Sequence, residues 1–324
     1  MSPWLALRRC VHAVVVVFIV ASLTFFLVRL APGDPFGAAM DNPNITPEVR
    51  EQWKRSYGFD RPLPEQYALY LAAVARGNFG WSFSTQRPVS EALRAAIPKT
   101  FLLAGTALLF SFAIGVGVAL VQARRPGSLT DRLLSKATLL AYSIPEFWLA
   151  LLLLLVFSLN LGLLPAGGAA DPVLHSRMDW MGRTLDTLKH LVLPVTALTV
   201  VGAAVVARYQ RAALLDILPS DFIRTARAKG VAEPLIVRRH ALRNALLPTI
   251  TLLGLTIPAL LAGSVFVEKI FAWPGMGLLA VNAVASRDYA VVTAVVVVAG
   301  TAVAIGNLIA DLLYAAADPR LRDG

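Results

Sequence analysis

The sequence predicts an all-α polytopic membrane protein with six transmembrane helices in a single domain, residues 1–324. Apolar residues make up 57% of the chain, and they occur in long runs separated by short polar stretches. A helix needs about 20 apolar residues to cross a hydrocarbon core of ~30 Å. Runs of that length, or nearly so, lie near residues 11–30, 100–122, 139–164, 191–207, 245–267 and 289–314.

The six runs differ in how clearly they predict a span. The run at 11–30 follows Arg8 and Arg9 as a signal peptide would, but it lacks a small-residue cleavage site, which predicts a retained helix. The run at 191–207 is short. Three stretches contain no Asp, Glu, Lys, Arg or His, any of which would be costly at a helix centre: Phe101–Val121, Ala245–Val267 and Tyr289–Ala310.

The distribution of Lys and Arg predicts the orientation. Sixteen of them lie before the first run, between the second and third, between the fourth and fifth, and after the last. On the other side, the segment 31–97 balances seven basic residues with seven acids. Because cytoplasmic loops carry the excess of Lys and Arg, both termini are predicted to be cytoplasmic. The formal charge of +10 is therefore explained by basic residues concentrated on the predicted cytoplasmic side. No nucleic-acid partner is expected.

The segment 31–97 predicts a small external cap after the first helix. Pro and Gly at 32–35 form a turn out of the membrane, and helices are expected from Thr46 or Pro47 and from Leu63 to Arg76. Its aromatic residues could contact a partner or pack at the membrane interface.

Two spans carry features that are candidates for a substrate path. Pro145 interrupts the third run, and Glu146 is the only carboxylate well inside an apolar run, although an interfacial structural role is the alternative. The fifth span is predicted to begin at Pro248 and to bend at Pro258, which is the second weak candidate. The last span carries Asn307 and Asp311 on one face, where they are expected to cap and pair.

The stretch 208–244 is a polar island between the fourth and fifth runs, with eight Lys or Arg against three acids. Pro219 ends the preceding helix, Ser220 or Asp221 can cap a new one, and Gly230 offers a left-handed stop. The pattern predicts a short helix at 221–229 and a second helix from Pro234.

The short helix has the composition of a docking surface. Phe222, Ile223 and Ala226 form an apolar patch at helical spacing, and charged residues surround it. The alternative is that the charges only set topology beside anionic headgroups, but that role needs neither the patch nor Gly230.

Other function classes fit the residues less well. The chain has no nucleotide-binding loop of the form GxxxxGK[ST], so ATP-driven work would have to come from a partner. An intramembrane serine protease needs a Ser in a GxSG setting and a membrane His, whereas Ser264 lies in Ala-Gly-Ser-Val and the four His lie near run ends or in loops. No catalytic residue or metal site is expected, and the single cysteine, Cys10, cannot form a disulfide within the chain. A self-contained secondary transporter remains an alternative, although clear midplane charges and inverted repeats are not evident.

Several sequence blocks together resemble the permeases of bacterial ATP-binding-cassette (ABC) importers, in the dipeptide, oligopeptide and nickel branch and of the first-permease type. Within the polar island, Arg224-Thr225-Ala226 stand where many relatives have Glu-Ala-Ala. The absence of this glutamate and the long interval from Gly230 to Pro248 are both similar to what the dipeptide and oligopeptide branch shows. The blocks, in order, are Leu30–Pro35, Tyr57–Leu63, Gly77–Gly80, Ser143–Pro145, Phe222–Gly230, Phe271–Gly275 and Asp318–Arg320.

The resemblance implies a type I importer permease fold in the inner membrane. It implies as partners a second homologous permease, two ABC ATPases that bind the ATP and Mg, and an external solute-binding protein, with no cofactor in this chain. Dipeptides or oligopeptides are the expected solutes, with nickel and glutathione as alternatives. The short helix would be the coupling helix in a groove of an ATPase, formed by Asp221, Phe222, Ile223, Arg224, Thr225, Ala226, Arg227, Lys229 and Gly230.

Overall fold

The computed structural model describes residues 3–30, 61–82, 84–261 and 264–317. Long helices dominate it. They are α1 (Pro3–Leu30), α4 (Leu63–Ala75), α5 (Val89–Arg124), α6 (Leu129–Ser143), α7 (Glu146–Leu153), α8 (Trp180–Ile217), α9 (Asp221–Ala228), α10 (Glu233–Leu235), α11 (Leu242–Leu261), α12 (Val265–Ile270), α13 (Met276–Ala285) and α14 (Tyr289–Ala317). Two π-helical segments, η1 (Leu154–Asn160) and η3 (Ile236–Ala241), a 3-10 turn, η2 (His175–Arg177), and two short strands, β1 (Trp81–Ser82) and β2 (Arg87–Pro88), complete the described part.

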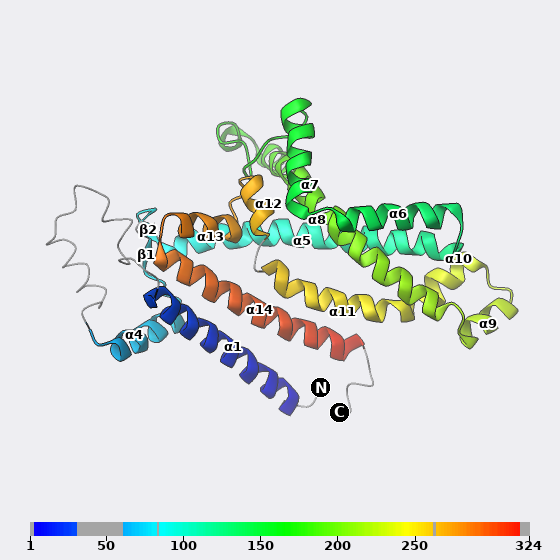
Figure 1. Ribbon diagram of the computed structural model, residues 1–324, viewed down its shortest axis with the longest axis horizontal. Helices are drawn as coiled ribbons and strands as arrows, with labels where there is room; N and C mark the ends of the chain where they lie inside the picture. Colours follow the sequence, from blue (N-terminus) through cyan, green and yellow to red (C-terminus); the bar gives the residue numbers. More distant parts are fainter. Residues whose placement is uncertain (1–2, 31–60, 83, 262–263, 318–324) are drawn as a thin grey trace.

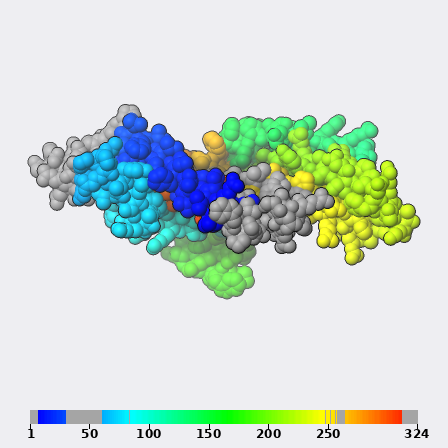
Figure 2. All heavy atoms as spheres, turned by 90° about the horizontal axis from the view of Figure 1, so that it is seen from below, coloured from blue at the N-terminus to red at the C-terminus, as the bar shows by residue number. Residues whose placement is uncertain are grey.

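The long helices form a bundle in which α14 lies between α1 and α11, and α5 packs along α8 (Figure 1). The short helix α9 lies at one end of the molecule, and α4 lies with the β1–β2 hairpin at the other. Figure 2 shows α1 along the surface with α4 at one of its ends. The α9 segment is therefore held at the end of the bundle opposite the cap.

Within the described residues, four helices are long and apolar enough to cross a membrane. A bent pair, α6 with α7 and η1, would add a fifth, and α11 with its 20 residues covers most of the remaining predicted run. The membrane-spanning all-α class is confirmed, and the count of six spans stays a prediction. The four helices are Leu7–Leu30, Val89–Arg124, Trp180–Ile217 and Tyr289–Ala310.

The fourth span is far longer than predicted. Instead of a short span at 191–207, α8 is one helix of 38 residues that passes through Pro194. Its N-terminus is capped by Asp179, whose Oδ1 accepts from the Gly182 N–H at 2.8 Å. Hydropathy identifies only the apolar middle of a helix. The polar turns at both ends of α8 also form helix, but the prediction did not include them.

The third run is not one nearly straight helix. Its two parts are bent by 97° at Ile144 and Pro145, because the residue before a proline favours an extended conformation and Ile144 takes one, with φ −79° and ψ 125°. The part after the bend, α7 and η1, projects away from the bundle (Figure 1).

The prediction that the fifth span begins at Pro248 is wrong. Helical structure begins at Glu233, passes through the π-helical η3 and continues through Pro248 to Leu261. Gln210 of α8 donates from Nε2 to the carbonyl oxygen of Ala245 at 3.0 Å. The proline leaves the carbonyl of residue 244 without its helical donor, and the bond from Gln210 to the next carbonyl, that of Ala245, ties this turn of the helix to α8.

The predicted cap at 31–97 is only partly described. Its first helix, expected from Thr46 or Pro47, lies outside the described residues, whereas the second is confirmed by α4. The Ser22 and Tyr67 hydroxyls lie 2.6 Å apart and join α4 to α1. Residues 89–97 belong to the long helix α5 and not to a separate cap.

Candidate functional site

Within the polar island, Asp221–Ala228 fold as the short helix α9, close to the limits that the sequence predicts. Pro219 follows the end of α8, and Ser220 is the N-cap with an extended backbone, φ −64° and ψ 154°. The Ser220 carbonyl oxygen accepts from the Arg224 N–H at 3.1 Å, while its Oγ donates to the Ile217 carbonyl at 2.6 Å. Ser220 therefore ends one helix and begins the next.

The end of α9 is a Schellman turn. Gly230 has φ +77°, its N–H donates to the Arg227 carbonyl at 2.9 Å, and the Val231 N–H donates to the Ala226 carbonyl at 3.2 Å. These two bonds satisfy carbonyls that a helix end leaves open. The predicted left-handed stop at Gly230 is confirmed.

Gly230→Ala is expected to lower the free energy of unfolding of this loop by about 1–2 kcal/mol. No atom lies within 4 Å of where its Cβ would be, so the cost comes from the left-handed backbone alone. Gly117→Ala is the matched control, because Gly117 is helical with equally open space and alanine favours helix there. Limited proteolysis after Arg227 and Lys229 measures the effect, and equal cleavage rates in the two variants would contradict it.

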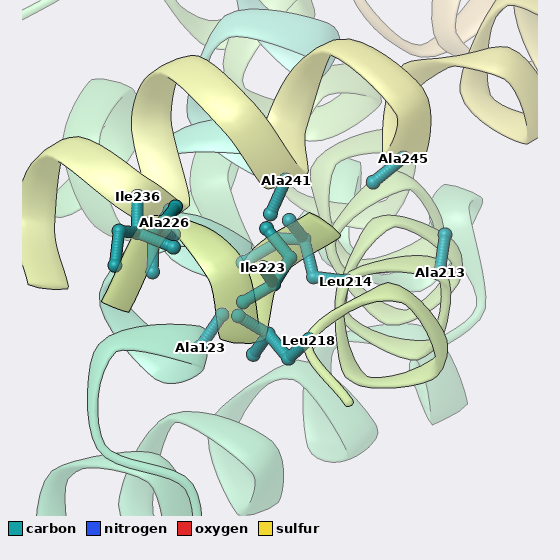
Figure 3. Packing of buried hydrophobic residues seen from close by; sticks show 11 residues of the cluster. Ala123, Ala213, Leu214, Leu218, Ile223, Ala226, Ile236, Ala241 and Ala245 are labelled. Atoms are coloured by element: carbon teal, nitrogen blue, oxygen red, sulfur yellow. The ribbon is translucent and has the colours of Figure 1, made fainter. Parts of the chain in front are cut away.

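One face of α9 is buried in the protein's own core. Ile223 is 0% exposed and Ala226 is 7% exposed. Figure 3 shows both side chains pointing into an apolar cluster built from four other elements, α5, α8, η3 and α11. The remaining members of the cluster are Ala119, Ala123, Ala213, Leu214, Leu218, Ile236, Val237, Ala241 and Ala245.

This packing corrects the predicted patch of Phe222, Ile223 and Ala226. Phe222 is 45% exposed whereas Ile223 is fully buried, because Phe222 lies about 100° around the helix from Ile223 and falls at the edge of the stripe that packs on the core. Only Phe222 remains as a large apolar contact for a partner. The exposed surface of α9 is formed by Asp221, Phe222, Arg224, Thr225, Arg227, Ala228 and Lys229.

A bidentate ion pair links the end of α9 to the next helix. Arg227 donates to Glu233 from Nη2 at 2.6 Å and from Nε at 3.0 Å. These hydrogen bonds from Arg227 lower the pKa of the Glu233 carboxyl. Both side chains are 43% exposed, so the pair contributes little free energy and chiefly orients the turn. In the sequence, this ion pair could have been predicted from the opposite charges of Arg227 and Glu233 on either side of the Gly230 turn.

A buried glutamine joins the two long helices that flank α9. Gln210 of α8 is 0% exposed, donates to the Ala245 carbonyl of α11, and accepts from Thr249 Oγ1. A buried amide with both ends satisfied holds the two helices in one register. Its role was not predicted, because Gln210 lies among cationic residues near a helix end.

A second polar link ties α6 to α8 beside the same cluster. Arg211 donates to Asp131 from Nε at 2.8 Å and from Nη2 at 2.9 Å. Asp131 is 2% exposed and also accepts from the Gly127 N–H at 2.9 Å. Gln122 of α5 lies 3.3 Å from the same carboxylate. The helix ends around α9 therefore form one connected unit.

The two weak path candidates are not brought together by the described contacts. Glu146 lies at the start of α7, after the bend, where its Oε1 accepts from Ser264 Oγ at 2.8 Å. This bond joins the third span to the N-terminus of α12. Pro258 lies inside α11, and its side chain is outside the described set. Their place in a substrate path stays a prediction.

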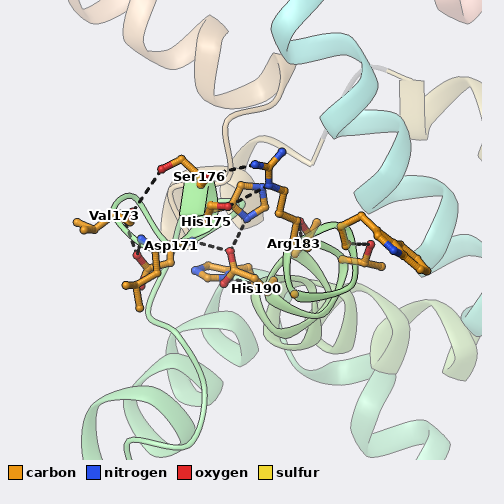
Figure 4. Close-up of polar contacts among 12 residues, drawn as sticks. Asp171, Val173, His175, Ser176, Arg183 and His190 are labelled. Carbon is orange, nitrogen blue, oxygen red and sulfur yellow. Dashed lines mark hydrogen bonds and ion pairs between the residues drawn. The ribbon is translucent and has the colours of Figure 1, made fainter. Parts of the chain in front are cut away.

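Asp186 of α8 organises the loop before this helix, and Figure 4 shows Asp171, His175 and His190 gathered there. Its Oδ2 lies 2.6 Å from His175 Nδ1, and its Oδ1 lies 3.3 Å from His190 Nδ1. The Asp171 N–H donates to the same carboxylate at 2.9 Å. These contacts anchor the loop to the first turns of α8. Among the described residues, no three His, Cys, Asp or Glu are grouped so as to hold a metal ion.

Glu268 of α12 is a buried acid that the sequence analysis did not single out. It is 0% exposed, and its Oε1 accepts from Thr100 Oγ1 at 2.9 Å. Its Oε2 accepts from the Gly277 N–H at 2.7 Å and the Leu278 N–H at 3.0 Å. The carboxylate thus caps α13 and anchors it to α5.

The sequence also matches known proteins. The family described as "Binding-protein-dependent transport system inner membrane component" matches residues 111–323, and the N-terminal family of such membrane components matches residues 3–104. The chain is 40% identical over 316 residues to an oligopeptide transport system permease protein, AppB, of Bacillus subtilis, covering 97% of this chain and 98% of the relative.

Two other relatives are named for different substrates. A di/tripeptide transport system permease protein, DppB, of Pseudomonas aeruginosa is 38% identical over 317 residues, with 94% of each chain covered. A glutathione transport system permease protein, GsiC, of Escherichia coli is 36% identical over 316 residues, with 98% of each covered.

A solved structure supports the fold. The inward-facing MetNI methionine ABC transporter matches with a TM-score of 0.53 at 21% identity, over 70% of this chain and 96% of that one. Because the family match covers most of the chain and the relatives align over nearly all of it, this chain belongs to the inner membrane components of binding-protein-dependent transport systems, the permeases of ABC importers.

Proposed function

We propose that this chain forms half of the path by which an ATP-driven importer moves dipeptides or oligopeptides across the inner membrane. The similarity to the oligopeptide and di/tripeptide permeases, over nearly the whole of each chain, is the observation that carries the proposal. Glutathione, itself a small peptide, is the second candidate because the GsiC relative aligns equally fully.

The partners follow from the same proposal. A second homologous permease would complete the path, two ABC ATPases would bind the ATP and Mg, and an external binding protein would deliver the solute. Both termini and α9 would lie on the cytoplasmic side, in agreement with the excess of Lys and Arg there. This chain would carry no cofactor and catalyse no reaction of its own.

The exposed face of α9 is proposed as the contact with an ATPase. Phe222 supplies an apolar anchor, and Arg224 and Lys229 supply charge beside it. The opposite face is locked into the permease by Ile223. A helix with one face free and one face buried can carry a partner's motion without bending.

The buried links determine where that motion would go. Ile223 packs on α5 and α8, and Gln210 ties α8 to α11. A displacement of α9 by ATPase closure would therefore tilt the spans on both sides of it together. The proposed result is a change of the path from inward-facing to outward-facing.

Reconstitution tests the proposal. The chain, purified with its second permease and its ATPases, is placed in proteoliposomes with the binding protein, and uptake of labelled dipeptide and oligopeptide is measured. Uptake of the labelled peptide is expected to require ATP, and unlabelled peptides are expected to inhibit it more strongly than nickel does. Inhibition by unlabelled glutathione shows whether glutathione, the second candidate, is also a substrate. Uptake driven by a proton gradient with no ATPase present would overturn the proposal.

A further inference from the structure

Two interruptions of the helical structure meet near the middle of the bundle. The third run bends by 97° directly before α7, and α12 begins after Ser264, whose backbone is not helical, with φ −86° and ψ 81°. Figure 1 shows α12 beside the base of α7, between the end that carries α9 and the end that carries the β1–β2 hairpin. In transporters built from broken helices, substrate sites lie where such helices meet at this depth.

A carboxylate lies at this meeting point. Glu146 is the first residue of α7, and its Oε1 accepts from Ser264 Oγ at 2.8 Å. The side chain is only partly buried, so a ligand can reach it. Among the described residues Ser264 is its hydrogen-bond partner, which leaves Oε2 able to accept from a ligand.

The charge of Glu146 is not matched from within the described part of the chain. No Lys, Arg or His there pairs with it, and residues 257–263, which precede Ser264, contain no basic residue in the sequence. A charge within a membrane segment is costly, so ionisable residues there face the bundle interior or a water-filled cavity and mark the paths of substrates or ions. Glu146 is therefore suited to a cation that comes from outside the protein.

The surroundings of Glu146 favour an organic cation over a metal ion. Phe147 and Phe266 follow the two linked residues, with ring centroids 6.2 Å apart, and they are 46% and 68% exposed. Aromatic rings attract ammonium groups and also contact apolar side chains. A metal ion would need further ligands, whereas no three His, Cys, Asp or Glu of the described chain are grouped to supply them. The protonated amino terminus of a peptide fits this combination.

We propose, on the basis of the peptide transport proposed above, that Glu146 binds the α-ammonium group of the peptide as it passes the middle of the membrane. The Ser264 hydroxyl holds Oε1, and Oε2 accepts from the ammonium group. The rings of Phe147 and Phe266 contact the first side chains of the peptide. Peptides with a free amino terminus are thereby favoured over peptides whose amino terminus is blocked.

Binding to the purified complex without its external binding protein tests this site, because the selectivity of the binding protein then does not enter. The chain, its second permease and its ATPases are placed in nanodiscs at about pH 7, where the amino terminus of trialanine is protonated. Kd values are measured for trialanine and for N-acetyl-trialanine. The wild-type complex is expected to bind trialanine about tenfold more tightly, as a hydrogen bond to a charged group predicts. Equal Kd values, or no binding of trialanine, would overturn the proposal.

Glu146→Gln separates the charge from the contact between α7 and α12. The amide keeps an oxygen that can accept from Ser264, so the Kd for trialanine is expected to rise to that for N-acetyl-trialanine, which itself stays at the wild-type value. Glu91→Gln is the matched control at an exposed acid of α5, and it is expected to keep the tenfold preference. An equal rise for both peptides in Glu146→Gln would show a purely structural role, and an unchanged preference would show that the ammonium group binds elsewhere. Either result would overturn the proposal.

Uptake of trialanine in proteoliposomes, with ATP and the binding protein added, separates this site from the proposed function. ATP-driven uptake by the wild type together with equal Kd values for the two peptides would reject the site at Glu146 alone. Failure of the wild type to take up any peptide with ATP would instead reject the peptide importer itself.

Discussion

Phe222→Ala is expected to lower ATP-driven peptide uptake by about tenfold or more while the permease keeps its stability and its place in the membrane. Phe222 is the one large apolar side chain on the exposed face of α9, and it is 45% exposed. Its removal takes nothing from the protein's own core, but it takes the anchor from the proposed ATPase groove. Uptake in proteoliposomes, with ATP hydrolysis measured in parallel, shows the loss of coupling.

The neighbouring Ile223→Ala change is the matched comparison. Ile223 is 0% exposed and packs in the cluster of α5, α8 and η3, so its truncation is expected to destabilise this end of the protein by about 2–5 kcal/mol. The expected signs are a lower midpoint of thermal unfolding and faster proteolysis of the loop. Phe222→Ala is expected to leave both of these unchanged.

Thr225→Ala supplies a surface control on the same helix. Thr225 lies on the same exposed face but carries no large apolar group, and its Oγ1 donates to the Asp221 carbonyl at 2.9 Å, so its loss of uptake is expected to be much smaller than that of Phe222→Ala. Wild-type uptake in Phe222→Ala would count decisively against α9 as the ATPase contact. An equal loss in Thr225→Ala would show a general sensitivity of the loop and not an aromatic anchor.

Glu268→Ala is expected to lower the free energy of unfolding by about 3 kcal/mol or more, since it leaves two buried donors and one partly buried donor without their acceptor. The donors are the Thr100 hydroxyl and the N–H groups of Gly277 and Leu278. A Cβ at Gly275 would lie 2.5 Å from Glu268 Oε2, so the surrounding backbone is closely packed on the carboxylate. The measurement is the unfolding midpoint of the purified protein in detergent.

Glu268→Gln separates the loss of acceptors from the loss of volume. The amide keeps the length of the side chain and one acceptor oxygen, so it is expected to cost clearly less than alanine. Glu91→Ala, at an exposed position in the first turn of α5, is expected to change stability by less than about 0.5 kcal/mol. Equal midpoints for Glu268→Ala and the wild type would show that α13 needs no carboxylate cap.

Local chemistry made some of the site readable without a structure. The helix α9 could be delimited because Pro219 cannot continue α8 and because Gly230 tolerates the left-handed backbone that ends α9. Both are properties of a residue and its immediate neighbours. The apolar runs were readable for the same reason, since the cost of a charge in hydrocarbon depends on the residue itself.

The errors arose where the result depends on what a segment packs against. Pro248 would break an isolated helix. Here Gln210 of α8 holds the backbone just before it through a hydrogen bond to the Ala245 carbonyl. Ile223 and Phe222 are adjacent apolar residues, and nothing in their order says which of them faces inward. Neither Gln210 nor Glu268 could be recognised, because a buried polar side chain is identified by its partners, Ala245 and Thr249 or Thr100 and Gly277.

The sequence by itself determined that the chain spans a membrane and where the short helix α9 begins and ends, and the side that its loops face stays a prediction. These follow from transfer free energies and backbone preferences that act residue by residue. Only the tertiary structure decided that α9 buries Ile223 and exposes Phe222 and that Gln210 joins α8 to α11. Those outcomes require side chains far apart in the chain to meet, and the free energy of their contact exists only in the folded protein.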